Sequence, residues 1–72
     1  MPNSSEVIKY IIQKEDGKFY WKSPNISSYY NWKDSLNDAT LFQTKCNAEK
    51  RVNLLRNISI NCKVREVIIT LK

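Results

Sequence analysis

Residues 7–22, VIKYIIQKEDGKFYWK, hold the pattern that decides the fold. Within residues 7–14, apolar side chains recur at every second position from Ile8 through Tyr10 to Ile12, as is typical of a β-strand with one buried face. Asp16-Gly17 is a strong signal for a tight turn, because both central residues of a type I′ turn need a positive φ angle. Residues 19–22 follow as a second, aromatic strand. The stretch therefore predicts an antiparallel β-hairpin.

A two-residue turn also fixes which side chains share a face of this hairpin. It places Lys14 opposite Phe19, and every later pair follows from that register. Tyr20 and Lys22 then fall on the wetter face. The expected core face consists of Ile8, Tyr10, Ile12, Phe19 and Trp21.

A single helix is predicted over residues 45–56. Thr44 is a good N-cap for it, and a narrow apolar stripe recurs at the i, i+4, i+7 spacing of one helical face. Leu54 lies off that stripe, and Asn57 suits the left-handed residue that often ends a helix. The stripe consists of Ala48, Val52 and Leu55.

Residues 63–71 form the last expected strand. Val67, Ile68 and Ile69 put apolar side chains on both of its faces, which indicates a central strand or an edge that pairs with another chain. The expected fold is α+β, in the order β-β-α-β, with one helix on one face of an antiparallel sheet. The sheet has three strands, or four if residues 40–42 add a short one. No helix covers the other face of the sheet. Side chains on that face are expected to be exposed or to pack on a partner; they are Lys9, Ile11, Tyr20 and Ile68.

Composition limits the function classes. Seventy-two residues make a single domain, residues 1–72, of which 1–6 are expected to be flexible. The chain has no histidine and one glycine, so it lacks the commonest general base and the glycine-rich loops that hold phosphates. Cys46 and Cys62 alone do not make a zinc site, and both are expected as small buried thiols. The chain is expected to be a non-enzyme without a metal or cofactor.

Charge divides the chain into two halves. Residues 1–44 sum to zero, whereas residues 45–72 carry the whole net charge of +5. All eight aromatic residues lie in the first half, between Tyr10 and Phe42. The N-terminus has no secretory signal, and the longest apolar run is far too short to cross a membrane. The protein is therefore expected in the cytoplasm.

Basic and aromatic side chains together are the chemistry of a binding surface. The basic residues would attract phosphates or an acidic protein surface, and the aromatic ones could stack on bases. Tyr29, Tyr30 and Trp32 suit either a core or a contact surface, and the sequence leaves both open. The candidate binding residues are Tyr20, Lys22, Tyr29, Tyr30, Trp32, Lys50, Arg51, Arg56 and Arg65.

Three segments carry a resemblance. The hairpin around Asp16-Gly17, the segment Asp38-Ala39-Thr40-Leu41-Phe42 and the helix with Ala48-Glu49 resemble small accessory proteins of bacteriophages and prophages. The resemblance implies a cytoplasmic, non-enzymatic inhibitor of a bacterial defence system. Such a protein would occlude a defence protein, or would sequester a nucleotide signal as a homo-oligomer. The alternative is a small basic regulator that binds nucleic acid.

Overall fold

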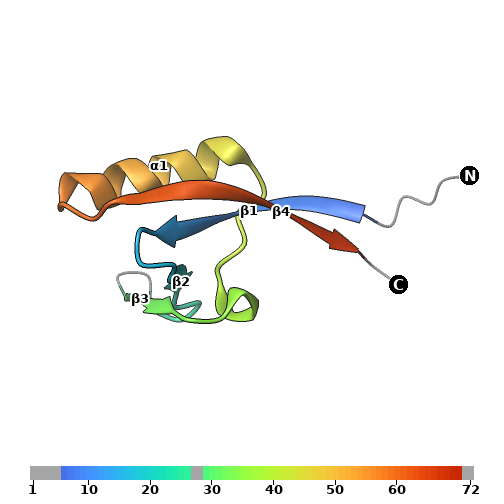
Figure 1. Cartoon of the computed structure of the whole chain (residues 1–72), viewed down its shortest axis with the longest axis horizontal. Helices are drawn as coiled ribbons and strands as arrows, with labels where there is room; N and C mark the ends of the chain where they lie inside the picture. The colour runs from blue at the N-terminus through green and yellow to red at the C-terminus, as the bar shows by residue number, and fades with distance from the viewer. Residues whose placement is uncertain (1–5, 27–28, 71–72) are drawn as a thin grey trace, which may run out of the picture.

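The computed structural model describes residues 6–26 and 29–70, which form a four-stranded antiparallel sheet and one α-helix. The strand order is β3-β2-β1-β4, and α1 lies along one face of the β1–β4 pair (Figure 1). This confirms the α+β class and the single helix, while the sheet has one strand more than the β-β-α-β order. The elements are β1 (Glu6–Lys14), β2 (Phe19–Lys22), β3 (Tyr30–Lys33), the 3-10 turn η1 (Leu36–Asp38), α1 (Lys45–Asn57) and β4 (Cys62–Thr70).

The hairpin register differs from the sequence prediction by one residue. The Lys14 N–H donates to the Lys18 carbonyl at 2.8 Å and the Gly17 N–H donates to the Lys14 carbonyl at 3.0 Å, so the loop has three residues instead of two. Gly17 has a φ of 92°, as the third residue of such a loop requires. Phe19 therefore pairs with Gln13. A shift of one residue turns every side chain of β2 to the other face, so Tyr20 belongs to the core.

Gly17 offers a direct check of this loop. An added Cβ would meet no heavy atom within 4 Å, so a substitution acts through the backbone alone. We expect Gly17→Ala to lower the free energy of unfolding by about 1–2 kcal/mol, the cost of a left-handed conformation for a residue with a Cβ. Gly17→Asn should cost less, because Asn tolerates that conformation. Urea unfolding measures both, and an alanine variant as stable as the parent would contradict the loop geometry.

The helix follows its sequence signals closely. Thr44 is the N-cap, and its Oγ1 accepts a hydrogen bond from the Asn47 N–H at 3.2 Å. The predicted stripe of Ala48, Val52 and Leu55 is buried. The helix ends one residue later than expected, and the positive φ of 69° belongs to Ser59 rather than to Asn57. The last turn closes with the Ile58 N–H bonded to the Leu55 carbonyl.

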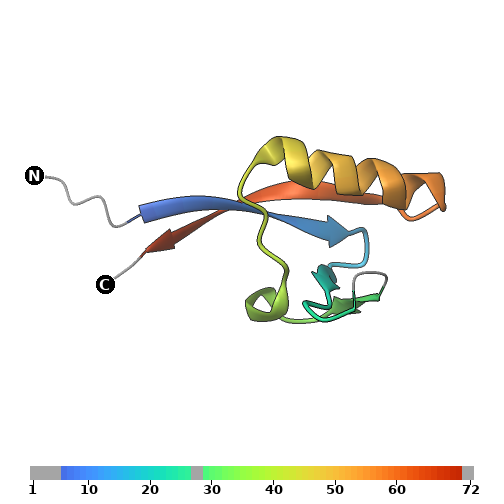
Figure 2. The ribbon, with the colours of Figure 1, turned by 180° about the vertical axis from the view of Figure 1, so that it is seen from behind.

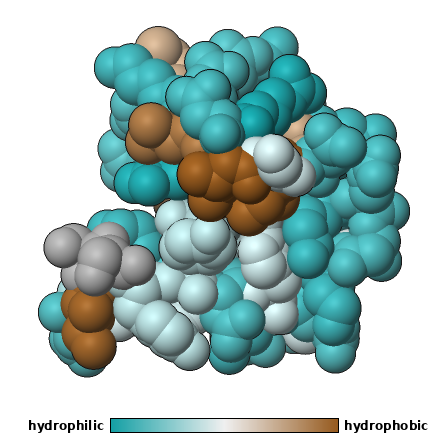
Figure 3. Space-filling model, turned by 90° about the vertical axis from the view of Figure 1, so that its left-hand side faces the viewer, coloured by the Kyte–Doolittle hydropathy of each residue, from teal (hydrophilic) through white to brown (hydrophobic). Residues whose placement is uncertain are grey.

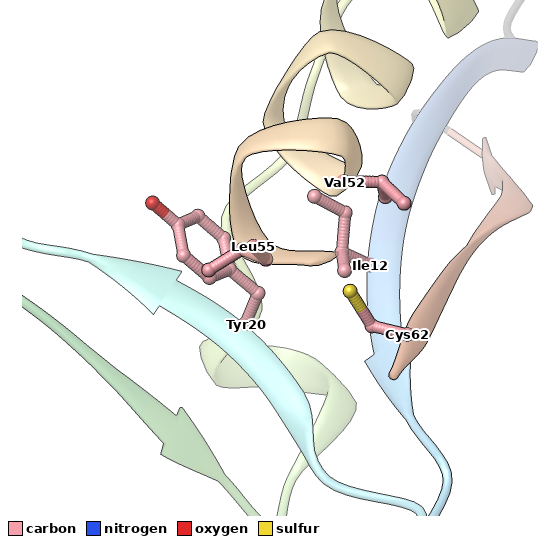
Figure 4. Close-up of a cluster of buried hydrophobic side chains, with 5 residues drawn as sticks. All are labelled: Ile12, Tyr20, Val52, Leu55 and Cys62. Atoms are coloured by element: carbon pink, nitrogen blue, oxygen red, sulfur yellow. The ribbon is translucent and has the colours of Figure 1, made fainter. Parts of the chain in front are cut away.

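The core lies between α1 and one face of the sheet. Figure 4 shows Val52 and Leu55 from α1 facing Ile12, Tyr20 and Cys62 from three strands. Ile12 is fully buried and Tyr20 is 1% exposed. Burial raises the pKa of the Cys62 thiol, while the nearby Arg56 partly offsets that rise. Both cysteines are free thiols, and the expectation that both are buried is wrong for Cys46, which is exposed.

Aromatic rings extend this core toward the edge of the sheet. Tyr20 packs on Tyr30 and Trp32, with ring centroids 5.7 Å away in each case. In β3, Tyr30 and Trp32 alternate with the exposed Asn31, so both rings lie on the same face of the sheet as Tyr20. Their packing against the core cluster stabilises this short strand. Phe42 joins the cluster and forms an antiparallel bridge with Tyr10. The segment of residues 40–42, which the sequence offered as a short extra strand, forms a single bridge to β1, and the fourth strand of the sheet is β3.

The opposite face of the sheet is partly covered. Ile11 is 2% exposed there, and Leu36 of η1 lines the hollow beside it. The expectation that Ile11 is exposed is therefore wrong, and so is that for Tyr20, which is buried on the α1 face. Ile68 is 61% exposed as predicted, but it lies on the α1 side, since it pairs with Ile8.

The paired ends of β1 and β4 form an arm. Glu6–Lys9 and Val67–Thr70 extend beyond α1 and beyond the rest of the sheet, as Figures 1 and 2 show from two sides. The molecule is accordingly 46 Å long and 22 Å across. Glu6 is the first residue of β1. Residues 1–5, Ser27, Ser28, Leu71 and Lys72 lie outside the described residues.

Candidate binding surface

The candidate aromatic residues are mostly part of the core. Tyr20 is buried, and Tyr30 and Trp32 are half-buried against it. Burial raises the pKa of the Tyr20 phenol, and the positive charge of Arg51 partly offsets that effect. Only Tyr29 is exposed, at 49%, and its ring meets Trp21 edge-on at 5.9 Å on the other face of the sheet. The structure therefore does not assemble these rings into one stacking platform.

The candidate basic residues are divided among different surfaces. Arg51 lies beside the aromatic cluster, where its charge acts on Tyr20. Lys50 is exposed on α1, and Lys22 is half-buried in β2, with its N–H bonded to Thr40 Oγ1 at 2.7 Å. Arg56 and Arg65 lie at the first half of β4, in two neighbouring hollows.

These two hollows define the candidate site. The first, of about 320 Å³, lies between α1 and β4 and contains Lys45, Arg56 and Lys63. The second, of about 490 Å³, lies between the β1–β2 turn and β4 and contains Lys14, Lys63 and Arg65. Because Lys63 lines both, the two hollows are neighbours at the first half of β4. We call the five basic residues Lys14, Lys45, Arg56, Lys63 and Arg65 the basic edge.

Local contacts hold the two arginines of the basic edge in place. Arg56 Nη2 donates to the Cys62 carbonyl at 3.4 Å, and Arg65 Nη1 donates to Gln13 Oε1 at 2.9 Å. Among the described residues, Glu49 and Glu15 are the acids that line the two hollows, one in each. Asp16, beside them, forms an ion pair with Lys14 Nζ at 3.5 Å. Cations therefore outnumber acids by five to three, which still favours an anionic partner.

The backbone of β4 adds hydrogen-bonding groups that have no partner among residues 6–26 and 29–70. Tyr10 exchanges both backbone hydrogen bonds with Phe42, at 2.9 and 2.8 Å, so its N–H and C=O point away from β4. Along an antiparallel strand, successive residues alternate between directing their N–H and C=O groups toward the neighbouring strand and directing them away from it. Tyr10 pairs with Glu66, so Glu66, and with it Val64 and Ile68, direct their N–H and C=O groups to the outer edge of the sheet. A strand of another molecule could pair there.

Apolar surface lies elsewhere on the molecule. A notch of about 310 Å³ at the base of the arm is lined mainly by Leu36, Leu41 and residues 67–69. Figure 3 shows the opposite end, where a small hydrophobic area is enclosed by hydrophilic side chains. Leu54 and Ile58, near the end of α1, are also exposed, at 56% and 57%.

Of the five residues of the basic edge, Arg56 and Arg65 are among the candidate binding residues, and Lys45 and Lys63 belong to the basic second half of the chain that the sequence singled out; only Lys14 was missed. Lys45 and Arg56 are about three helical turns apart and so share a face of α1. The position of Lys63 and Lys14 depends on how α1 and the hairpin pack against β4.

Neither a metal centre nor a membrane span emerges from the described residues. Among residues 6–26 and 29–70, His, Cys, Asp and Glu side chains form no group of three or more that could hold a metal ion. The helical segments of the same ranges are too short and too polar to cross a bilayer. No family model, curated protein or solved structure matches the chain.

Proposed function

We propose that this chain is a non-enzymatic binding protein that covers an acidic surface of a partner protein with its basic edge. In line with the resemblance to phage accessory proteins, the partner would be a bacterial defence protein whose working surface is occluded. The observation that carries the proposal is the cluster of five cations around the first half of β4, next to outward-facing backbone groups.

A protein partner is better supported than a nucleotide or a nucleic acid. Recognition of a free nucleotide or of single-stranded bases needs aromatic faces close to the cations. Here three of the four candidate rings, Tyr20, Tyr30 and Trp32, pack in the core. Lys14 of the basic edge does lie over the Trp32 ring, with Nζ 4.9 Å from the centroid, so the lysine itself occupies that face. Acidic protein surfaces need no such platform, since charge steers the encounter and backbone groups fix the register.

A matched pair of charge-reversal variants tests the proposal. Lys45→Glu with Lys63→Glu changes the basic edge, whereas Lys22→Glu with Lys50→Glu makes the same change of net charge outside it. We expect the first variant to lose anti-defence activity, measured as phage plating on bacteria that carry the defence system and express the chain. If each reversed charge at the rim of the interface costs about 1 kcal/mol of binding free energy, the two together lower the affinity for the partner about thirtyfold. The control variant should keep both properties.

Two results would contradict the proposal. Equal loss in both variants would mean that net charge, and not the basic edge, governs binding. Binding to random-sequence DNA or RNA that falls steeply with salt and disappears in the Lys45/Lys63 variant would favour the nucleic-acid regulator instead.

A further inference from the structure

The arm has the features of an incomplete sheet. It is a two-stranded ribbon, and isolated two-stranded ribbons are at best marginally stable in water. Ile8 and Ile68, which pair across it, are 49% and 61% exposed on one face. Val7 and Ile69 pair on the other face, where the apolar notch begins. Another strand beside β4 would complete the ribbon and cover part of this surface.

Edge protection is missing over the same segment. Proteins commonly place charges along an exposed edge strand to prevent pairing with other chains. The first half of β4 has such charges in Lys63, Arg65 and Glu66, whereas Val67–Thr70 has none. Ile68 directs its N–H and C=O to the open edge, by the alternation that Tyr10 and Phe42 establish. The open, uncharged part of the edge is therefore confined to the arm.

We propose that the arm binds the arm of a second copy of this chain, with the two β4 strands paired antiparallel about Ile68. Two copies of a strand can pair about a twofold axis that is perpendicular to the sheet and passes beside one residue. That residue then faces its counterpart, and each face of one arm continues as the same face of the other. Ile68 then faces its counterpart, and a row of four isoleucines, Ile8-Ile68-Ile68-Ile8, crosses the four-stranded arm on one face. On the other face, Val67 lies opposite Ile69 of the second copy, beside the notch.

Charge disfavours registers closer to the start of β4 and allows a second copy as the occupant. Pairing about Arg65 or Glu66 would put like charges directly opposite each other, which is destabilising. Pairing about Ile68 keeps the two Lys63 residues ten residue steps apart, about 33 Å at the rise of a strand. That distance is well beyond the screening length of about 8 Å at physiological ionic strength. The arm itself has one acid and one lysine, Glu6 and Lys9, so two arms meet without net repulsion despite the +5 charge of each chain.

Analytical ultracentrifugation over a dilution series tests the proposal with a matched pair. The parent chain should sediment at twice its 8.5 kDa mass and dissociate on dilution. Ile68→Glu should weaken the dimer about tenfold or more, since it places two carboxylates opposite each other. Leu54→Glu, at a residue of similar exposure on α1, should leave it unchanged. A parent chain that is monomeric at every concentration, or equal weakening by both variants, would overturn the proposal.

Two further variants test the backbone pairing and the register. Ile68→Pro removes only an N–H that points outward, so circular dichroism should show a folded chain and ultracentrifugation a monomer. In a Cys46→Ser background, Ile68→Cys should form an intermolecular disulfide on mild oxidation, because residues at a directly opposed hydrogen-bonded pair lie about 5.5 Å apart. Val67→Cys should not. Cross-linking at residue 67 instead, or a proline variant that still dimerises, would overturn pairing about Ile68. None of these results depends on the proposed function, which is read from the basic edge.

Discussion

Tyr20→Ala is expected to unfold most of the protein in water. Tyr20 is 1% exposed and its ring contacts Tyr30, Trp32 and Phe42 at centroid distances of 5.7, 5.7 and 6.2 Å. Removing a buried aromatic ring costs about 3–5 kcal/mol. A core of this size rarely supplies more than about 3–5 kcal/mol of stability. Near-ultraviolet circular dichroism and urea unfolding should therefore show loss of the cooperative transition.

Two companion variants make the Tyr20 result specific. Tyr20→Phe keeps the ring and should cost less than about 1.5 kcal/mol, while Tyr29→Ala, at an exposed ring, should stay within about 0.5 kcal/mol. A harmless Tyr20→Ala would instead favour the two-residue turn, in which this side chain points to solvent.

Alkaline pH gives an independent measure of the same residue. Burial raises the pKa of Tyr20 in the folded chain above its ordinary value of 10.0, so the folded state holds the phenol proton more tightly than the unfolded state does. The contribution of this pKa difference to the free energy of unfolding is fully present below pH 10 and is lost as the pH rises through the folded pKa. Tyr20→Phe should therefore lose less stability than the parent above pH 10, as urea unfolding at several pH values would show.

The hairpin shows where sequence reasoning stops being sufficient. Glu15-Asp16-Gly17 satisfies both a two-residue turn over Asp16-Gly17 and a three-residue loop with Gly17 last, because each places a glycine where φ is positive. Propensity does not separate the two. The packing of Tyr20 under α1 distinguishes them in the folded chain, and that contact joins segments more than thirty residues apart in the sequence.

The candidate site was predictable only in part for a similar reason. Arg56 and Arg65 were candidates from charge alone, and the structure places them in two neighbouring hollows that share Lys63. Tyr20, Tyr30 and Trp32 were candidates for contact, but β3 is only four residues long, too short a run for its period of two to stand out. By contrast, the cap at Thr44 and the stripe on α1 are local signals, and both were read correctly.

Val52→Asp should separate the buried face of α1 from its exposed face. Val52 is 5% exposed and packs in the cluster with Ile12 and Leu55, whereas Leu54, two residues later, is 56% exposed. A carboxylate at position 52 would be buried without a partner, at a cost of about 3–5 kcal/mol. Leu54→Asp should cost about 0.5 kcal/mol, the helix-propensity difference alone. Thermal unfolding of the two variants side by side measures the contrast.

The pH dependence of the Val52→Asp variant identifies the cause of its instability. Burial would raise the pKa of the new carboxyl above its unfolded value of about 3.9, because a low dielectric disfavours the charged form. The penalty is then absent below that value and grows as the pH rises through the folded pKa. Relative to Val52→Asn, which has no carboxyl to titrate, the variant should regain stability between neutral pH and pH ~4. Identical pH profiles for the two variants would mean that lost packing, and not a buried charge, explains the effect.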